Sequence, residues 1–293
     1  MADGILLLDK PQGFTSFDVI AKLRGMSRQR KIGHAGTLDP MATGVLPCLF
    51  GTATRLCDIM PCEDKSYRAT VQFGVTTDTQ DITGNVTATS SVTFTLAQLE
   101  ATLPAFRGLI TQLPPMYSAV QVNGKRLYDL AREGREVARP SRQITIHALE
   151  LVDFDADSRS AVFDVTCSKG SYVRTLFHDI GQALGCGAAL STLRRTASSG
   201  FFISDCITLA QAQLLTDAGT LLDHLLPVSA AFSLLPRFEV GEWQGKMLCN
   251  GVALSLNKLG HPAPGKYAVW GQGVFLGLGT VGAQEDCMRL RRF

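Results

Sequence analysis

Apolar and polar residues alternate regularly over residues 65–75. One face carries apolar side chains and the other carries polar ones, which predicts a half-buried strand. The apolar face comprises Tyr67, Ala69, Val71, Phe73 and Val75. Comparable apolar patterns predict strands at 45–50, 143–153 and 161–167.

Helical spacing appears between these strands and is marked by capping residues. The capping-box pairs that open three predicted helices are Thr15 with Asp18, Thr95 with Gln98, and Thr208 with Gln211. The first helix is predicted over 15–25. A fourth is predicted over 172–184, before Gly185, with an apolar stripe of Val173, Leu176, Phe177, Ile180 and Leu184.

Two segments differ from this mixture of strands and helices. Residues 114–143 carry an Asn123-Gly124 turn signal and a local excess of positive charge, which predict a protruding basic insertion. A solvated charged face explains the same composition. After an apolar linker at 226–236, the Gly-rich remainder predicts a small all-β appendage of roughly 55–60 residues.

Composition sets only broad limits on function. The 293 residues suit one large domain with an appendage, or two medium domains. The net charge of +2 neither requires nor excludes a nucleic-acid partner. The eight cysteines lack Cys-x-x-Cys pairs and zinc spacing, so they are expected to be reduced core residues. No signal peptide or membrane span is evident, and a cytoplasmic protein is expected.

Four residues stand out as candidates for chemistry, each with a structural alternative. Asp39 lies in a glycine-punctuated loop, where Pro40 restricts its backbone and so fixes where the carboxylate points, although Asp-Pro is also a common turn dipeptide. Arg174, in the first turn of a predicted helix, is explained by a buried carboxylate partner or by an exposed position. Tyr67 and His34 fit base contacts, or equally a core tyrosine and an exposed histidine.

Several sequence blocks, in order, together resemble the TruB family of tRNA pseudouridine synthases over about residues 5–200. The blocks include Leu8-Asp9-Lys10-Pro11-Gln12-Gly13, Gly33-His34-Ala35-Gly36-Thr37-Leu38-Asp39-Pro40, Lys65-Ser66-Tyr67-Arg68, Gly124-Lys125-Arg126-Leu127-Tyr128, Gly170-Ser171-Tyr172-Val173-Arg174-Thr175 and Leu193-Arg194-Arg195. The resemblance implies that uridine-55 in the TΨC loop of tRNA is isomerised to pseudouridine after base flipping.

The resemblance also implies roles for individual residues. Asp39 is the expected nucleophile, Arg174 its ion-pair partner, and Tyr67 a contact to the target uracil with a further role as a base. The expected substrate-binding residues are His34, Tyr172, Leu193, Lys10, Lys125 and Arg126. An arginine partner favours an ionised carboxylate, and a carboxylate suits attack on a glycosyl centre.

The implied fold is α+β. Residues 1–228 are expected to form a catalytic domain with a mixed, largely antiparallel sheet flanked by helices, and the basic insertion would grip the T stem-loop of tRNA. Residues 236–293 would form a small PUA-like β domain. The reaction involves no redox change or hydrolysis, so no metal or organic cofactor is expected. A monomer is expected, and the choice between a C1′ adduct and a glycal path stays open.

Two other functions remain as alternatives at this stage. A non-catalytic RNA-binding or RNA-folding module would use the same basic clusters, but would not need Asp39, Tyr67 and Arg174 together. A nucleoside or nucleic-acid glycosidase would often need a second carboxylate, and nothing in the sequence places Asp78 or Asp81 near Asp39.

Overall fold

The computed structural model describes residues 2–57, 59–122 and 124–293. In these ranges no helix is both long and apolar enough to cross a membrane.

The larger part of the molecule is built on one mixed sheet, formed in the described chain by ten strands. Its strands are β1 (Gly4–Lys10), β2 (Ile32–His34), β3 (Thr43–Phe50), β4 (Lys65–Phe73), β7 (Gly108–Gln112), β10 (Arg142–Asp155), β11 (Ser160–Cys167), β12 (Ala188–Ser198), β13 (Phe201–Phe202) and β14 (Ile207–Thr208). The order is β14-β1-β3-β12-β4-β11-β10-β7, with β2 beside β3 and β13 beside β12. The pairs β1–β14 and β3–β12 are parallel and the others are antiparallel, which confirms the predicted mixed, largely antiparallel sheet.

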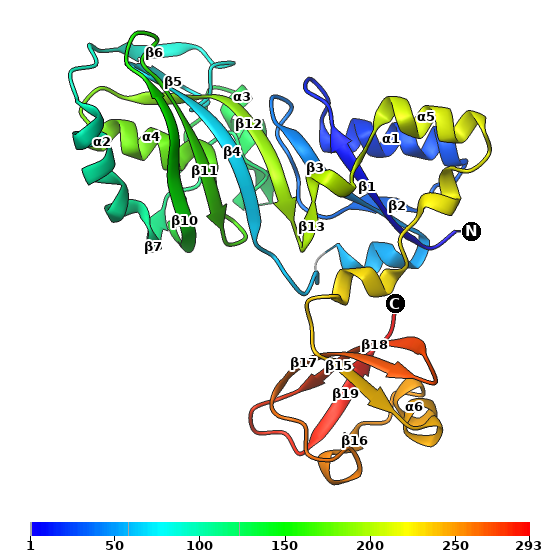
Figure 1. Cartoon of the computed structure of the whole chain (residues 1–293). Helices are drawn as coiled ribbons and strands as arrows, with labels where there is room; N and C mark the ends of the chain where they lie inside the picture. The colour runs from blue at the N-terminus through cyan, green and yellow to red at the C-terminus, as the bar shows by residue number, and fades with distance from the viewer. Residues whose placement is uncertain (1, 58, 123) are drawn as a thin grey trace.

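Helices pack on the two halves of this sheet (Figure 1). The helices are α1 (Ser16–Ser27), α2 (Leu96–Thr102), α4 (Val173–Ala183) and α5 (Leu209–Asp217). Leu176, Phe177 and Ile180 of α4 enter one core with β4, β10, β11 and β12, while α1 and α5 share another with β1 and β3. All three predicted capping boxes are present, so these helices begin where local sequence signals place them.

Two small hairpins project from the sheet. The hairpin of β5 (Val75–Thr77) and β6 (Val86–Thr89) carries the loop at 78–84. In the predicted basic insertion, β8 (Gln121–Val122) pairs with β9 (Lys125–Arg126), and α3 (Leu127–Arg132) follows. Asn123 of the expected turn lies outside the described residues.

The C-terminal residues form a second, smaller sheet in the order β15-β17-β18-β19-β16. Its strands are β15 (Arg237–Val240), β16 (Leu254–Ser255), β17 (Gly265–Gly271), β18 (Val274–Val281) and β19 (Cys287–Arg291). The expected C-terminal β unit is confirmed, and it also contains one short helix, α6 (Glu242–Cys249), that was not predicted. Figure 1 shows this unit below the larger sheet.

The smaller sheet shares a hydrophobic core with the larger one. Phe232 ends the 3-10 helix at Val228–Phe232 and lies 5.0 and 5.1 Å, between ring centroids, from Phe275 and Phe293. The same cluster of buried side chains includes Ile5 and Leu49 of the large sheet. The C-terminal unit therefore shares one cluster of buried side chains with β1 and β3, and Phe232 packs against it.

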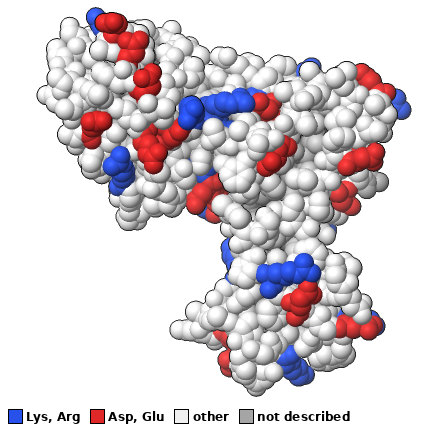
Figure 2. Space-filling view, viewed as in Figure 1, with Lys and Arg blue, Asp and Glu red and all other residues white. Residues whose placement is uncertain are grey.

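Over β4, β11 and β12, one face of the large sheet is open and carries mostly polar side chains. Arg68 forms a two-point hydrogen-bonded pair with Asp164, and Arg194 forms another with Asp9. In Figure 2 the blue and red side chains over this sheet lie next to each other, so this view shows no extended basic patch.

Candidate active site

The loop between β2 and β3 carries Asp39 and is fixed on its upstream side by Arg195 of β12. The guanidinium Nη2 donates to the carbonyl oxygen of Gly36 at 2.9 Å, and Nη1 donates to that of Thr37 at 3.4 Å. Arg195 is completely buried, so these bonds are shielded from competing water.

The two residues that flank Asp39 are held by the end of β1, the start of α1 and the segment between them. The backbone N–H of Leu38 donates to Ser16 Oγ at 2.9 Å. The carbonyl oxygen of Pro40 accepts from the N–H of Gly13 at 2.8 Å and from Lys10 Nζ at 3.4 Å. The aspartate between Leu38 and Pro40 is thus presented by a backbone that is anchored on both sides.

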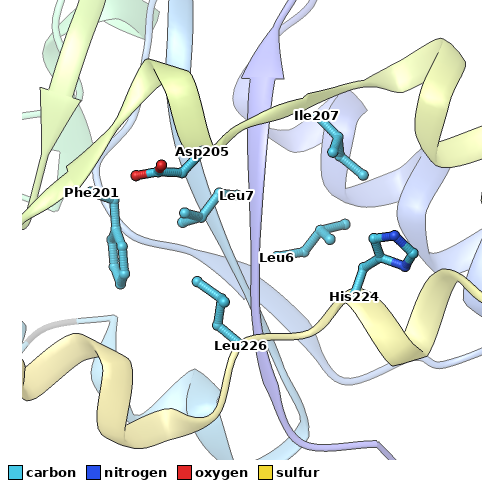
Figure 3. Close-up of a pocket in the computed structure, with 7 residues that line it drawn as sticks. All are labelled: Leu6, Leu7, Phe201, Asp205, Ile207, His224 and Leu226. Carbon is cyan, nitrogen blue, oxygen red and sulfur yellow. The ribbon is translucent and has the colours of Figure 1, made fainter.

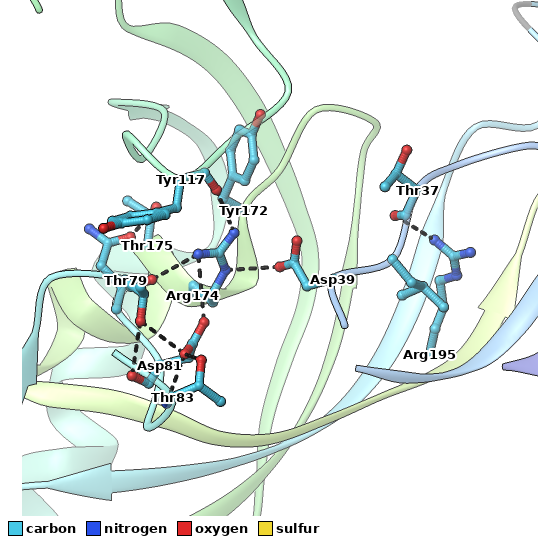
Figure 4. Close-up of polar contacts among 12 residues, drawn as sticks. Thr37, Asp39, Thr79, Asp81, Thr83, Tyr117, Tyr172, Arg174, Thr175 and Arg195 are labelled. Carbon is cyan, nitrogen blue, oxygen red and sulfur yellow. Dashed lines mark hydrogen bonds and ion pairs between the residues drawn. The ribbon is translucent and has the colours of Figure 1, made fainter. Parts of the chain in front are cut away.

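Asp39 pairs with Arg174 at the start of α4. Arg174 Nε lies 2.9 Å from Asp39 Oδ2. A dashed line in Figure 4 marks this ion pair. The arginine side chain is only 5% exposed, whereas that of the aspartate is 39% exposed. The carboxylate therefore has one oxygen bound to the guanidinium and still has surface open to a ligand. The expected Asp39–Arg174 ion pair is present.

A second carboxylate, Asp81, lies on the other side of the same guanidinium. Its Oδ2 is 3.6 Å from Arg174 Nη1, and its side chain is 5% exposed. Its Oδ1 accepts from the N–H of Thr83 at 3.0 Å and from the hydroxyls of Thr83 and Thr79 at 2.5 and 2.9 Å. Asp81 is therefore fully bonded within the hairpin loop at 78–84 and holds a fixed negative charge against the arginine.

Backbone carbonyls take the remaining contacts of the Arg174 guanidinium. Nη1 donates to the carbonyl oxygen of Thr79 at 2.8 Å, and Nη2 donates to that of Tyr117 at 2.9 Å. These bonds explain why a cation is tolerated at a buried helix N-terminus, where the helix dipole opposes it.

Tyr67 and Leu193 enter the same core region from adjacent strands. Tyr67, on β4, is 7% exposed, and Leu193, on β12, is also 7% exposed. Burial raises the pKa of Tyr67 to about 12, although the charge of Arg195 opposes that rise. The phenol is therefore neutral at physiological pH.

Tyr172 lies at the N-terminus of α4, and its backbone and ring are both held. Gln112 accepts from the N–H of Tyr172 at 2.8 Å and donates to its carbonyl at 3.0 Å. The Arg142 guanidinium lies 5.2 Å from the ring centroid, in a cation–π arrangement. The start of the helix is thus anchored on the same side of the protein as Arg174.

His34 ends β2 and is half-buried. Burial, reinforced by the nearby charge of Arg195, lowers its pKa, so the neutral ring is favoured. Within the described part of the chain its Nδ1 has no hydrogen-bond partner. That atom is itself buried, so a base can meet only the exposed part of the neutral ring.

Lys10 does not occupy the position expected of a substrate-binding residue. Its side chain is completely buried. Its ammonium donates to the carbonyls of Phe14 at 2.6 Å and Pro11 at 2.9 Å, in addition to Pro40. Burial lowers its pKa to about 8. Lys10 therefore supports the Asp39 loop from the interior and has no exposed surface with which to contact RNA.

Lys125 and Arg126 are exposed on β9 of the basic insertion. Arg126 Nη1 donates to the hydroxyl of Tyr128 at 3.1 Å. Part of the insertion's positive charge is used internally, because Arg139 donates to the carbonyl of Pro114. These exposed cations belong to a separate element from the Asp39 cluster.

Sequence reasoning missed two residues of this cluster. The sequence does not place Asp81 near Arg174, because no local pattern relates a hairpin loop to a distant helix. Arg195 was noted only as part of a sequence block. The β-strand alternation around Arg194 and Arg195 is the one signal that could have indicated an inward-facing cation.

A hollow of about 290 Å³ lies beside β1, away from the Asp39 cluster. Figure 3 shows the residues that line it. Its lining is mainly apolar, and the polar atoms of its two titratable residues are engaged locally. Asp205 accepts from the N–H of Phe202, and His224 Nδ1 lies 3.2 Å from the carbonyl of Thr220. No set of converging polar groups comparable with the Asp39 cluster is found there in the described residues.

Comparison with known proteins gives consistent matches. The model of the TruB family pseudouridylate synthase N-terminal domain matches residues 24–173, and that of the tRNA pseudouridylate synthase B C-terminal domain matches residues 174–233. A tRNA pseudouridine synthase B of Dechloromonas aromatica (strain RCB) is 44% identical over 282 residues, covering 96% of this chain and 92% of that protein. One from Geobacillus thermodenitrificans (strain NG80-2) is 44% identical over 260 residues, covering 87% and 86%.

The fold also matches solved structures. A chain in the crystal structure of a Cbf5-Nop10-Gar1 complex superposes with a TM-score of 0.76 at 25% sequence identity, covering 99% of this chain and 84% of that one. A chain in the structure of an H/ACA RNP bound to a substrate RNA containing 2'-deoxyuridine gives a TM-score of 0.74 at 22% identity, with 99% and 84% covered. The latter similarity shows the fold alone.

Proposed function

The chain belongs to the TruB family of pseudouridylate synthases, and we propose that it isomerises uridine-55 in the TΨC loop of tRNA to pseudouridine. The observation that carries this proposal is the partly exposed Asp39 carboxylate bound at 2.9 Å to the buried Arg174. A pseudouridine synthase must act at a glycosyl carbon, and an oriented, ionised carboxylate is suited to that task.

Asp39 is the proposed nucleophile. In the reaction the N1–C1′ bond of uridine breaks, the uracil rotates, and a C5–C1′ bond forms, after which the proton on C5 is lost and N1 gains one. Asp39 either bonds to C1′ or removes a proton from C2′ to give a glycal. Arg174 orients the carboxylate in both cases, because its Nε holds one oxygen while 39% of the aspartate side chain stays exposed.

Tyr67, Tyr172, Leu193 and His34 form the proposed surroundings of the target base. The uracil must leave the stacked RNA loop to reach Asp39, and aromatic and apolar side chains would then receive it. His34 would take the space that the flipped base leaves. Tyr67 enters as a neutral phenol with a pKa of about 12, so a role as base requires that its own proton be passed on.

The proposed organisation assigns catalysis to residues 1–228 and RNA gripping to the insertion at 114–143. Lys125 and Arg126 are exposed there and would contact phosphates of the T stem-loop. Residues 236–293 would be the PUA-like unit. No step in this scheme draws on a metal or an organic cofactor.

The experiment uses tRNA transcribed with uridine tritiated at C5, incubated with the purified protein and with Asp39→Asn. Isomerisation replaces the C5–H bond, so tritium enters water. We expect release by the wild type only, without free uracil, and retained tRNA binding by both proteins. Normal turnover by Asp39→Asn would refute the proposed nucleophile. Tight binding without release by the wild type would favour an RNA-binding module instead.

A further inference from the structure

Arg195 is a completely buried cation in β12. Its neighbour Arg194 points to the open face of the sheet and binds Asp9, whereas the guanidinium of Arg195 points inward. In the ranges that the structure describes, Arg195 forms no ion pair with a carboxylate. Burial lowers its pKa, which reflects the cost of holding an unbalanced charge away from water. Such a residue needs specific acceptors to be retained in the interior.

In the described residues, the guanidinium donates three hydrogen bonds to backbone carbonyls, and all three acceptors lie at the two ends of one segment, 36–45. Arg195 Nε donates to the carbonyl of Val45 at 2.7 Å, Nη2 to that of Gly36 at 2.9 Å, and Nη1 to that of Thr37 at 3.4 Å. A guanidinium presents its donors in a rigid planar fork, so it fixes these acceptors relative to one another. Figure 4 shows the bond to Thr37 beside the loop that leads to Asp39.

The same guanidinium also lies against the hydroxyl of Tyr67. The two residues are paired opposite each other in the β4–β12 ladder. The charge of Arg195 and a hydrogen bond between the side chains both oppose the rise in the pKa of Tyr67 that burial causes. One side chain therefore binds the loop that presents Asp39 and also lies beside the phenol of Tyr67.

We propose that Arg195 is a positioning residue for the isomerisation, which sets the Asp39 loop and the Tyr67 hydroxyl relative to each other without touching the uridine. This inference rests on the proposed function. A simple structural tie between β3 and β12 would not require a buried cation, because the backbones already pair at Gly44 and Arg195.

The test is Arg195→Lys, measured with the tritiated tRNA under single-turnover conditions at saturating enzyme. Lysine keeps the charge but offers a compact donor that cannot span the same acceptors. We expect the Kd for tRNA to stay within about threefold and the isomerisation rate to fall about 100-fold, since small displacements of reacting groups have effects of that size. The matched control is Arg194→Lys, in the same strand but on the opposite face, which should keep close to the wild-type rate.

A purely structural role predicts a different pattern. In that case Arg195→Lys would lower Tm, yet the folded enzyme with RNA bound would react at the wild-type rate, and this result would overturn the proposal. Tyr67→Phe and the double variant supply a second criterion. If Arg195 acts partly through Tyr67, the double variant loses less than the product of the two single losses, and fully multiplicative losses would contradict that contact.

A further measurement does not depend on an active enzyme or on a folded Arg195 variant. Tyr67→Phe removes an oxygen from beside the buried guanidinium, so its Tm should fall by about 3 °C or more. An unchanged Tm would refute the contact, including when Arg195→Lys does not fold. Absence of tritium release by the wild type would instead refute the proposed function, while this thermal result would still decide whether Arg195 makes the contact.

Discussion

Replacing Asp81 by asparagine removes one of the two negative charges on the Arg174 guanidinium while changing little in shape. Asp81 Oδ1 can be replaced by the amide oxygen, which still accepts from the N–H and hydroxyl of Thr83 and from the hydroxyl of Thr79. The amide nitrogen then takes the place of Oδ2, 3.6 Å from Arg174 Nη1, and faces another donor. The loop should keep its structure, but the arginine loses an anionic partner.

The magnitude follows from what Arg174 retains. Removing one partner of a buried ion pair costs about 3–5 kcal/mol when the other charge is left alone. Here Arg174 keeps Asp39 at 2.9 Å and the carbonyls of Thr79 and Tyr117, so we expect about 1–2 kcal/mol. If this loss of free energy raises the activation barrier because Asp39 is less well oriented, the isomerisation rate falls roughly 10-fold. A loss of stability of the same size would lower Tm by about 2–8 °C.

The assay is single-turnover tritium release at saturating enzyme, together with tRNA binding and thermal unfolding. The matched control is Asp78→Asn, because Asp78 lies in the same loop but binds Asn85 and not Arg174. We expect a slower rate with unchanged affinity for Asp81→Asn and near-normal behaviour for the control. A wild-type rate for Asp81→Asn, with Asp39→Asn inactive, would refute the view that Asp81 helps to orient the site.

Three other substitutions have defined outcomes. Burial lowers the pKa of Lys10 in the folded protein to about 8, so the unfolded chain binds that proton more tightly. The stability of the wild type relative to Lys10→Met should therefore rise from about pH 8 towards 10.5. Thermal unfolding of both proteins across that range would contradict this if the difference in stability stayed flat or fell. Phe232→Ala removes a ring that packs on Phe275 and Phe293, and it should lower the free energy of unfolding by about 3–5 kcal/mol. Denaturant unfolding should still show a single transition, because both sheets share this core. Two separate transitions would argue against a shared core. Gly44 has a φ of +106°, and an alanine there would place its Cβ 2.1 Å from the carbonyl oxygen of Arg195. For Gly44→Ala, the soluble yield and the tritium release should therefore both fall sharply. A normal Tm would show that β12 can move aside.

Elements defined by neighbouring residues were predictable from the sequence. The capping box of Thr15 and Asp18 begins α1, and the alternation at 65–75 corresponds to β4 over Lys65–Phe73. The helix predicted at 172–184 is α4, over Val173–Ala183. In each case the residues that predict the element lie within that element or next to it, so contacts with distant segments are not needed to specify the helix or strand.

Contacts between distant segments were not predictable in this way. Strand β12 is inserted between β3 and β4, and that placement brings Arg195 under the Asp39 loop. Asp81 reaches Arg174 across more than ninety positions of the chain. Lys10 illustrates the opposite error, because a lysine is usually exposed, yet here three carbonyls bind its ammonium in the interior. The resemblance to a family supplied the Asp39–Arg174 pair that spacing alone did not.

The open polar face of β4, β11 and β12 offers practical access to the enzyme. Thr70 and Thr192 meet on it through a hydroxyl–hydroxyl hydrogen bond at 2.8 Å, and their side chains point away from the face that buries Tyr67. Once the five partly exposed cysteines are replaced, a cysteine placed at either position would carry a fluorophore or a surface tether on the side opposite the Asp39 cluster. Those five are Cys57, Cys62, Cys206, Cys249 and Cys287. The protein could then be immobilised in a defined orientation, with its reactive side left free for single-molecule observation of RNA arrival and release.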